Sequence, residues 1–173
     1  MVCLSPLSSD DVTTVAGWLA RPEIGKWLDF GPGHERLDTL ALKFMLTRQQ
    51  YHVLFTFTPE AGGQKIGVVA LSNLHRAFGT AMLWYALGDP THGSRGHTTR
   101  AVSELLSVGF EQLGLGAINA WTVSGNEASR RVLEKNGFTL IGRQRRCHLV
   151  DGKMRDRLLF DLMSAEFTGR KHA

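Results

Sequence analysis

The residues best suited to chemistry in this chain form a short turn between two apolar segments. The turn reads Arg95-Gly96-His97-Thr98-Thr99, follows an apolar strand candidate at Ala81–Leu87 and opens a segment with helical periodicity. The first N–H groups of a helix have no intrahelical partner, and the helix dipole favours negative charge beside them. A strand, a glycine turn and a helix N-terminus in this order therefore predict a site for a pyrophosphate.

The turn matches neither of the common nucleotide motifs. A P-loop ends in Gly-Lys-Ser/Thr, and the dinucleotide fingerprint has three spaced glycines, whereas this turn contains only Gly93 and Gly96. Taken alone, a glycine turn before a helix is usually an ordinary loop. A second stretch favours a ligand site, because it reads Asn126-Glu127-Ala128-Ser129 and continues through Leu133-Glu134-Lys135 to Gly137-Phe138.

Together the two stretches resemble the GNAT acetyltransferases that acetylate the N-termini of ribosomal proteins. In that family Arg-Gly-x-Gly-x-Gly/Ala-Thr-Glu-Ala precedes a helix and a strand, and Asn-x-x-Ser-x-x-x-Leu-Glu-Lys-x-Gly-Phe follows them. The second pattern is present here from Asn126 to Phe138, while the first departs at Gly93, Ser94, Thr98 and Arg100. The hydroxyl and guanidinium groups of the altered turn still suit a phosphate ligand.

The resemblance implies an α/β (α+β) GNAT fold, in which helices flank a single mixed central sheet. The strands at Ala81–Leu87 and Ala117–Val123 are then expected to run parallel and splay apart, with the pantetheine arm of acetyl-CoA in the gap. Acetyl-CoA is the implied cosubstrate, and no metal is expected. The residues implied in cofactor binding are Tyr85, Leu87, Arg95, Gly96, His97, Thr98, Thr99, Asn126, Ser129 and Lys135.

Acetyl transfer needs a neutral amine, a hydrogen-bond donor for the carbonyl oxygen and a proton for the leaving thiolate. By resemblance, a backbone N–H of Trp84–Leu87 holds the oxygen, and Ser129 is the candidate acid, with a packing serine as the alternative. His148 is the candidate base, since an unperturbed histidine titrates near neutral pH. A structural His148, with Asp89 or water as the base, is the alternative.

An aromatic stretch between the first two helix candidates suggests the acceptor site. Trp27, Asp29, Phe30 and Trp84 combine aromatic faces with a carboxylate, which suits a protonated amine, whereas Trp121 is expected in the core. Overall similarity to compact resistance enzymes makes a small-molecule amine the leading acceptor, in particular an aminoglycoside antibiotic such as kasugamycin. The N-terminal α-amine of a ribosomal protein is one alternative, and a non-catalytic CoA-binding regulatory module is another.

The composition is that of an ordinary globular chain. Its 173 residues, of which 43% are hydrophobic and 21% charged, predict one acetyltransferase domain over residues 1–173. No apolar run is long enough for a membrane span and no secretory signal is visible, so we expect a cytoplasmic protein without membrane contact. Cys3 and Cys147 lack metal-ligand spacing and agree with a reducing compartment.

The net charge of +4 permits nucleic-acid binding without requiring it. We expect no nucleic-acid partner, because aromatic residues do not interleave with the basic ones. The main basic cluster indicates a solvated hairpin face, with steering of a phosphate ligand as the alternative, and comprises Arg143, Arg145, Arg146, Lys153, Arg155 and Arg157. For the assembly we expect a monomer or a homodimer.

Hydrophobic periodicity predicts the elements that position these residues. Strands are expected at Val2–Leu7, Val53–Thr58, Ile66–Leu71, Ala81–Leu87, Ala117–Val123, Leu140–Leu149 and Arg157–Met163. Helices are expected at Ser8–Leu19, Leu37–Met45, Gly96–Leu113 and Asn126–Asn136. Between the first two helices, Pro22 and Gly25 are expected to break the helix, and an irregular stretch ends in the turn Gly31-Pro32-Gly33.

Overall fold

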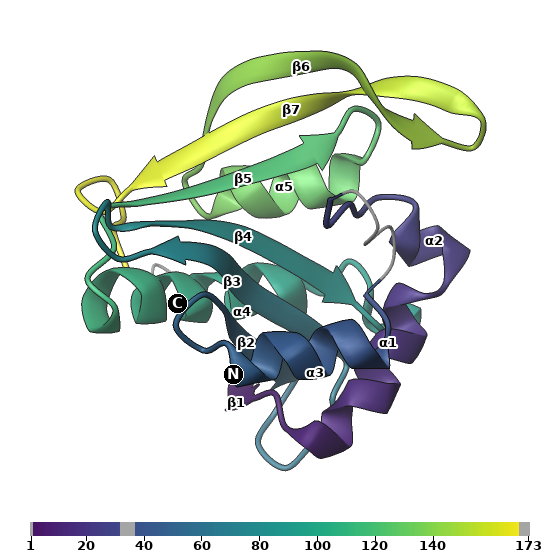
Figure 1. Ribbon diagram of the computed structural model, residues 1–173, viewed down its shortest axis with the longest axis vertical. Helices are drawn as coiled ribbons and strands as arrows, with labels where there is room; N and C mark the ends of the chain where they lie inside the picture. The colour runs from purple at the N-terminus through teal and green to yellow at the C-terminus, as the bar shows by residue number, and fades with distance from the viewer. Residues whose placement is uncertain (1, 32–36, 170–173) are drawn as a thin grey trace.

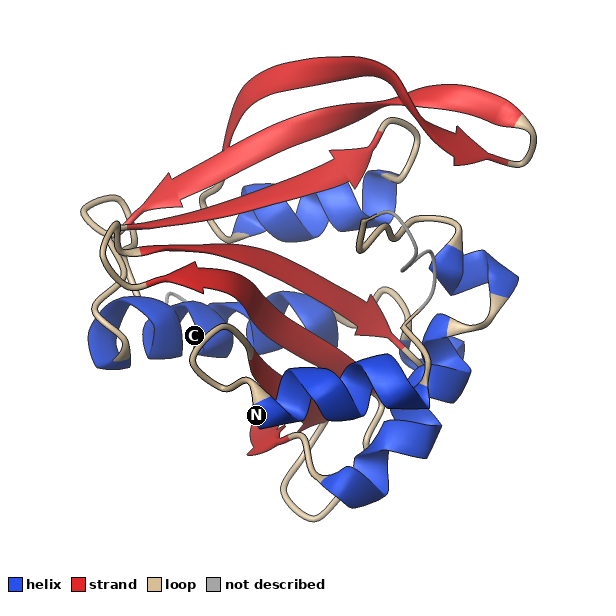
Figure 2. Cartoon of the chain, viewed as in Figure 1, coloured by secondary structure: helices blue, strands red, loops and turns tan. Residues whose placement is uncertain are grey.

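In the computed structural model, which describes residues 2–31 and 37–169, a seven-stranded mixed sheet forms the middle of the molecule (Figure 1 and Figure 2). The strands lie in the order β1-β2-β3-β4-β5-β7-β6. They are β1 (Cys3–Pro6), β2 (Val53–Thr58), β3 (Gly67–His75), β4 (Thr80–Leu87), β5 (Ala117–Val123), β6 (Thr139–Val150) and β7 (Lys153–Met163).

Helices cover both faces of this sheet. The helices are α1 (Val12–Leu19), α2 (Pro22–Gly25), α3 (Thr39–Thr47), α4 (His97–Ser107) and α5 (Glu127–Lys135). Short turns complete the order: η1 (Ser9–Asp11), η2 (Pro90–His92) and the π-helical η3 (Val108–Gln112). Helices α1 and α3 pack on one face, and α4 and α5 pack on the other.

The pleat of the strands separates two hydrophobic cores. In β3, Val68 and Ala70 pack with the residues of α1 and α3, while Val69 and Leu71 pack with those of α4. Successive side chains of a strand point to opposite faces, so this alternation is what a sheet covered on both faces requires. The two cores hold the strands rigidly from both faces, so any gap between the strands has rigid walls.

Strands β4 and β5 are parallel neighbours that pair over only part of their length. Their register runs from Thr80 opposite Ala117 to Met82 opposite Asn119 and then stops. Beyond that point β4 stays paired with β3, and β5 stays paired with β7. The expected mixed sheet with a splayed parallel pair is therefore confirmed, and Figure 1 shows the two strands diverging toward their C-terminal ends.

The structure corrects several predicted boundaries. Pro22–Gly25 forms the short helix α2, because proline is well tolerated at the first position of a helix. The helix predicted to reach Leu113 changes to the π-helical turn η3 after Ser107. Strand β7 begins at Lys153 instead of Arg157, which lengthens the final hairpin. The turn predicted at Gly31-Pro32-Gly33 extends into residues 32–36, which lie outside the described residues.

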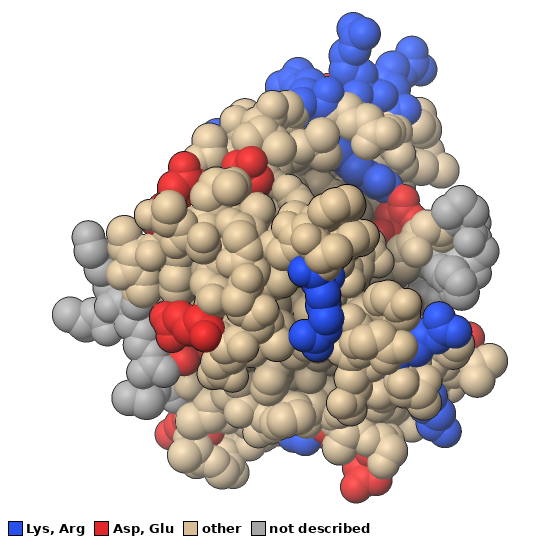
Figure 3. Space-filling view, turned by 60° about the vertical axis from the view of Figure 1, so that its left-hand side comes forward, with Lys and Arg blue, Asp and Glu red and all other residues tan. Residues whose placement is uncertain are grey.

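The basic cluster predicted near the end of the chain lies on the β6–β7 hairpin. Figure 3 shows Lys and Arg side chains gathered at the top of the molecule, where Figure 1 places this hairpin. Arg143, Arg145, Arg146, Lys153 and Arg155 are all exposed, as expected for a solvated face. Within the described ranges, no helix has both the length and the apolarity needed to cross a membrane.

Candidate functional site

A cleft of about 1420 Å³ follows the gap between the splayed strands. One of its walls comes from β4, β5, α5 and the turn before α4, and the other comes from the segment after α2 together with α3. The cleft lining brings together nearly all the residues singled out in the sequence, namely Trp27, Asp29, Phe30, Trp84, Tyr85, Leu87, Gly96, His97, Thr98, Thr99, Asn126, Ser129 and Lys135. Arg95 and His148 are not among the lining residues.

The turn before α4 combines two left-handed residues with an uncapped helix start. Ser94 has φ = +61° and Gly96 has φ = +74°, and Gly96 is the N-cap residue. Because Gly96 has no side chain, it leaves the first N–H groups of α4 without a side-chain hydrogen bond. Arg100 stabilises the turn, because its Nη2 donates a hydrogen bond to the backbone oxygen of Arg95 at 3.1 Å. The turn therefore has the geometry with which helix N-termini bind anions.

Asn126 and Ser129 are held together at the start of α5. The Asn126 side-chain oxygen accepts a hydrogen bond from the Ser129 N–H at 3.2 Å, so Asn126 is an N-cap. Tyr85 on β4 reaches across to the same residue: its hydroxyl lies 2.8 Å from Ser129 Oγ and donates to the Ser129 backbone oxygen at 3.0 Å. Burial raises the pKa of Tyr85, so the phenol stays protonated and keeps its donor. This contact fixes the position of the Ser129 hydroxyl beside the cleft.

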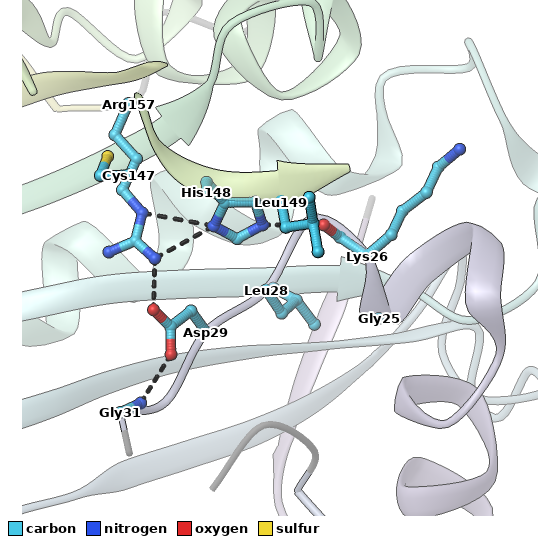
Figure 4. Close-up of a pocket in the computed structure, with 9 residues that line it drawn as sticks. All are labelled: Gly25, Lys26, Leu28, Asp29, Gly31, Cys147, His148, Leu149 and Arg157. Atoms are coloured by element: carbon cyan, nitrogen blue, oxygen red, sulfur yellow. Dashed lines mark hydrogen bonds and ion pairs between the residues drawn. The ribbon is translucent and has the colours of Figure 1, made fainter. Parts of the chain in front are cut away.

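The predicted acceptor residue Asp29 is part of a polar network rather than a free carboxylate. Its Oδ1 accepts a hydrogen bond from the Gly31 N–H at 2.8 Å, and its Oδ2 forms an ion pair with Arg157 (Figure 4). The Gly31 hydrogen bond and then the Arg157 guanidinium lower the pKa of Asp29. The negative charge of Asp29 is thus already neutralised by Arg157.

The geometry of His148 does not suit the predicted role of a base. Arg157 Nη2 donates to His148 Nδ1 at 3.0 Å, and arginine has no acceptor, so Nδ1 carries the lone pair. The other ring nitrogen, Nε2, then donates to the Lys26 backbone oxygen at 2.8 Å. Figure 4 shows both nitrogens engaged, and this buried ring lines a neighbouring pocket of about 430 Å³, which shares Asp29 and Arg157 with the cleft.

The other polar and aromatic candidates occupy distinct places. Asp89, the alternative base, caps η2 by accepting from the Thr91 N–H at 3.0 Å and is not among the residues that line the cleft. The prediction that Trp121 lies in the core is wrong: the ring is half-buried, lines the cleft and packs under the Arg157 guanidinium at 4.2 Å. The divergence of β5 from β4 exposes this side chain. Trp84 donates to Ser72 Oγ at 2.8 Å.

Two further cleft residues were missed in the sequence. Among the described residues, His52 Nδ1 and Thr122 Oγ1 are the two buried side-chain polar atoms that lack a hydrogen-bond partner, and both residues line the cleft. A buried polar group without a partner costs free energy, so a ligand that supplies the partner gains affinity. No sequence signal marks either residue, because their burial depends on the splay of the strands and on the packing of α3.

Among the described residues, no group of His, Cys, Asp and Glu side chains is arranged to hold a metal ion. The cleft thus combines an anion-binding helix start, a gap between parallel strands and a half lined by aromatic side chains. This geometry is what the predicted acetyl-CoA site requires.

Comparison with known proteins decides the family. The family model of the acetyltransferase (GNAT) domain matches residues 2–139. The chain belongs to the GNAT acetyltransferases. Among its relatives is the putative ribosomal N-acetyltransferase YdaF of Bacillus subtilis (strain 168), which is 31% identical over 153 residues. This match covers 86% of the present chain and 82% of YdaF.

Solved GNAT structures share the fold over nearly the whole chain. The spermidine N-acetyltransferase from Vibrio cholerae, in complex with CoA and spermine, has a TM-score of 0.83 at 17% identity and covers 95% of this chain and 96% of its own. Mycobacterium smegmatis RimJ, in complex with CoA-disulfide, has a TM-score of 0.77 at 24% identity and covers 96% and 84%. At such identities the likeness establishes the fold alone.

As a GNAT acetyltransferase, the protein transfers an acetyl group from acetyl-CoA to the nitrogen of an amine. Acetyl-CoA supplies the acetyl group as a thioester, an acyl donor that an amine can attack directly. The residues of the cleft fit this cosubstrate, because the unpartnered Thr122 hydroxyl and the uncapped N–H groups of α4 lie along one continuous lining.

Proposed function

We propose that this GNAT enzyme acetylates the N-terminal α-amine of a peptide or protein that carries apolar residues next to that amine. The observation that carries the proposal is the lining of the acceptor half of the cleft, which is mostly apolar and aromatic: Trp27, Leu28, Phe30, Leu37, Leu40, Ala41, Phe44, Met45 and Trp84. Asp29, which lies among these residues, is paired with Arg157, so its carboxylate is not free to bind a cationic acceptor.

On this proposal, the turn of Arg95, Gly96, His97, Thr98 and Thr99 holds the pyrophosphate of acetyl-CoA. Backbone N–H groups at the start of α4 bind its oxygens, and Lys135 at the end of α5 is close enough to the cleft to add positive charge. Asn126 and the Thr122 hydroxyl contact the pantetheine arm between the splayed strands. The Tyr85 and Leu87 backbone lines the other side of the arm.

The Ser129 hydroxyl acts at the leaving sulfur. Its position is fixed by the Tyr85 hydroxyl at 2.8 Å, so it is oriented before the substrates arrive. A preorganised donor stabilises the negative charge that develops on sulfur more than it stabilises the ground state. A backbone N–H of the Trp84–Leu87 segment holds the carbonyl oxygen in the same way.

An amino sugar is the second candidate acceptor. The cleft lining includes the carboxylates of Glu23 and Asp38, and both residues are exposed. Two exposed carboxylates at one edge of the cleft would attract a multiply protonated amino sugar such as an aminoglycoside. This attraction is screened by salt, whereas the contact of an apolar peptide with the aromatic wall is not.

A thiol-release assay tests the proposal. The enzyme is incubated with acetyl-CoA and with peptides that have a free or a blocked α-amine and an apolar or a charged second residue, alongside kasugamycin, other aminoglycosides and spermidine. We expect CoA release with the free apolar peptides, and mass spectrometry should find the added acetyl group on the α-amine. Turnover of amino sugars alone would move the assignment to the second candidate. Acetyl-CoA binding by calorimetry without any CoA release would indicate a regulatory module.

A further inference from the structure

The established reaction leaves one chemical task without a residue. The attacking amine nitrogen gains positive charge as it bonds to the acetyl carbon, so a base must take a proton from it. That base has to lie in the acceptor half of the cleft and must be unprotonated near neutral pH. His148 does not meet the first requirement, because it lines another pocket, and both of its ring nitrogens are already hydrogen-bonded within the fold.

The other acidic and histidine side chains of the cleft lining are paired, open to solvent or located at the cofactor end. Asp29 is paired with Arg157, and Asp38 caps α3 by accepting from the Ala41 N–H at 2.8 Å. Glu23 is exposed on α2. The histidines of the pyrophosphate turn, His92 and His97, lie at the cofactor end of the cleft. This elimination leaves His52.

We propose that His52 is the general base that removes the proton from the acceptor amine; this inference rests on the proposed transfer to an amine in this cleft. His52 directly precedes β2, whose first residue, Val53, pairs with Leu71 on β3. It therefore lies beside Ser72, which anchors the indole of Trp84, and all three residues line the acceptor half of the cleft. Trp84 in turn lies where β4 has just separated from β5, which is where the gap begins.

The state of the ring suits a base. His52 Nδ1 is buried and, within the described residues, has no hydrogen-bond partner, so the amine is expected to reach the ring at Nε2, and the ring is not committed to the fold as both nitrogens of His148 are. Burial and then the positive charge of Arg48 lower the pKa of His52, which keeps the imidazole neutral at physiological pH. The residues of β3 and the start of β4 that line the cleft with it, Ser72, Asn73 and Met82, carry no titratable group, and the charged group that acts on His52 is Arg48 at the C-cap of α3.

The proposed step balances without a further reactant. The lone pair of the amine forms the new C–N bond, the C–S bond breaks, and the electron pair of that bond leaves with sulfur. His52 takes one proton from nitrogen and returns it to solvent, while the sulfur takes a proton through the Ser129 hydroxyl, which solvent replaces, to give the free thiol of CoA. The products are an amide and CoA, and His52 ends in its starting state.

The test compares His52→Gln with His75→Gln as the matched control, because His75 stacks on Phe78 outside the cleft. We expect His52→Gln to lower kcat/KM for the amine by about 100-fold or more, since general base catalysis typically contributes about 10²–10⁴-fold. Acetyl-CoA affinity by calorimetry and the thermal unfolding midpoint should stay near the wild-type values. The acidic limb of the wild-type pH profile should lie below pH 6.5 and be absent from the variant.

A second measurement does not depend on turnover. NMR titration of the histidine ring protons, assigned with the two variants, should give His52 a pKa below 6.5 and a shift of its signals when an acceptor amine joins the CoA complex. Full activity of His52→Gln with an unchanged acidic limb would overturn the proposal, and so would an NMR pKa at or above 6.5. Failure of every amine to release CoA from the wild type would instead count against the proposed function, and the NMR pKa would still decide the role of His52.

Discussion

At the scale of single residues, the site depends on a few polar groups whose partners come from distant parts of the chain. Ser129 on α5 is held by Tyr85 on β4, and His148 on β6 is held by Arg157 on β7 and by the Lys26 backbone. These two residues differ in whether a polar group remains available to a ligand. The Ser129 hydroxyl lines the cleft, whereas the His148 ring is fully engaged inside the fold.

Removing the Tyr85 hydroxyl should impair turnover more than cosubstrate binding. Tyr85→Phe keeps the ring in place but deletes the hydrogen bonds to Ser129, so the Ser129 hydroxyl loses its orientation. A hydrogen bond of this kind is worth about 0.5–1.5 kcal/mol, which predicts a fall in kcat of up to about tenfold. Steady-state kinetics should show a KM for acetyl-CoA near the wild-type value. Tyr51→Phe, at an exposed tyrosine, is the control, and an equal loss there would refute the role of Tyr85.

Replacing Thr122 by valine should stabilise the fold and at the same time weaken the binding of acetyl-CoA. The side chain is 3% exposed and its hydroxyl lacks a hydrogen-bond partner. Thr122→Val therefore replaces a buried, unsatisfied hydroxyl with a methyl group of nearly the same size. We expect the free energy of unfolding to rise by about 1 kcal/mol or more, while calorimetry shows weaker binding of acetyl-CoA. The control is Thr56→Val, because the Thr56 hydroxyl donates to the Ser5 backbone oxygen. Unchanged acetyl-CoA affinity in Thr122→Val would show that this hydroxyl does not contact the cosubstrate.

At the scale of elements, the site forms where the pairing of two strands ends and where a helix starts. Pairing of β4 with β5 ends after Met82 and Asn119, and the N-cap residue of α4, Gly96, has no side chain. Each interruption leaves backbone groups without intrachain partners, and such groups bind a ligand that can satisfy them. The Asp29–Arg157 pair also acts at this scale, since it ties the segment after α2 to β7 across the end of the cleft.

A methyl group at the N-cap of α4 should weaken acetyl-CoA binding beyond its effect on folding. Gly96→Ala forces a non-glycine residue to φ = +74°, which costs about 1 kcal/mol or more. The added methyl would also lie 3.4 Å from Arg100 Nη1 and disturb the guanidinium that holds the turn, so we expect about tenfold weaker affinity, or about 1.4 kcal/mol. Gly114→Ala is the control, because Gly114 has φ = +66° and open space around its Cβ position. Equal affinity for acetyl-CoA in the two variants, measured by calorimetry, would show that the pyrophosphate does not bind at this turn.

At the scale of the whole molecule, one continuous cleft joins the cofactor end to the acceptor end. Its volume of about 1420 Å³ exceeds the roughly 300–1,000 Å³ typical of a small-molecule pocket, in agreement with two substrates held together. The exposed basic residues of the β6–β7 hairpin lie outside this lining, which contains only the half-buried Arg157 of that cluster. Specificity for the acceptor is therefore expected from the aromatic wall and not from the basic surface.

Acetyl-CoA should stabilise the whole fold, because its proposed contacts come from β4, β5, α4 and α5 together. At a free concentration one hundred times its Kd, binding to the folded state alone adds about 2.7 kcal/mol. For a chain of 173 residues this predicts a rise in Tm of about 5–10 °C by differential scanning fluorimetry. Acetyl-pantetheine, which lacks the nucleotide and its pyrophosphate, should give a much smaller rise at the same concentration. Equal shifts would mean that the α4 turn contributes little.

The sequence alone determined the elements and indicated the residues of the proposed cofactor half of the site. Hydrophobic periodicity is a local property, so strands such as Ala117–Val123 and the helix at Asn126 were predictable within a residue or two. The turn at Gly96 and the pattern from Asn126 to Phe138 are contiguous motifs, and contiguous residues stay neighbours in the fold. The family resemblance rested on these motifs and is confirmed by the match to residues 2–139.

Only the tertiary structure decided which side chains are committed and which are available. The Asp29–Arg157 pair joins residues 128 positions apart, and the bond from His148 to Lys26 spans 122 positions, so neither is visible as a pattern. His52, Thr122 and Trp121 line the cleft only because β4 and β5 stop pairing and α3 packs on one face of the sheet. Burial and hydrogen-bond satisfaction are properties of the packed chain, and these two quantities separate a candidate base from a structural histidine.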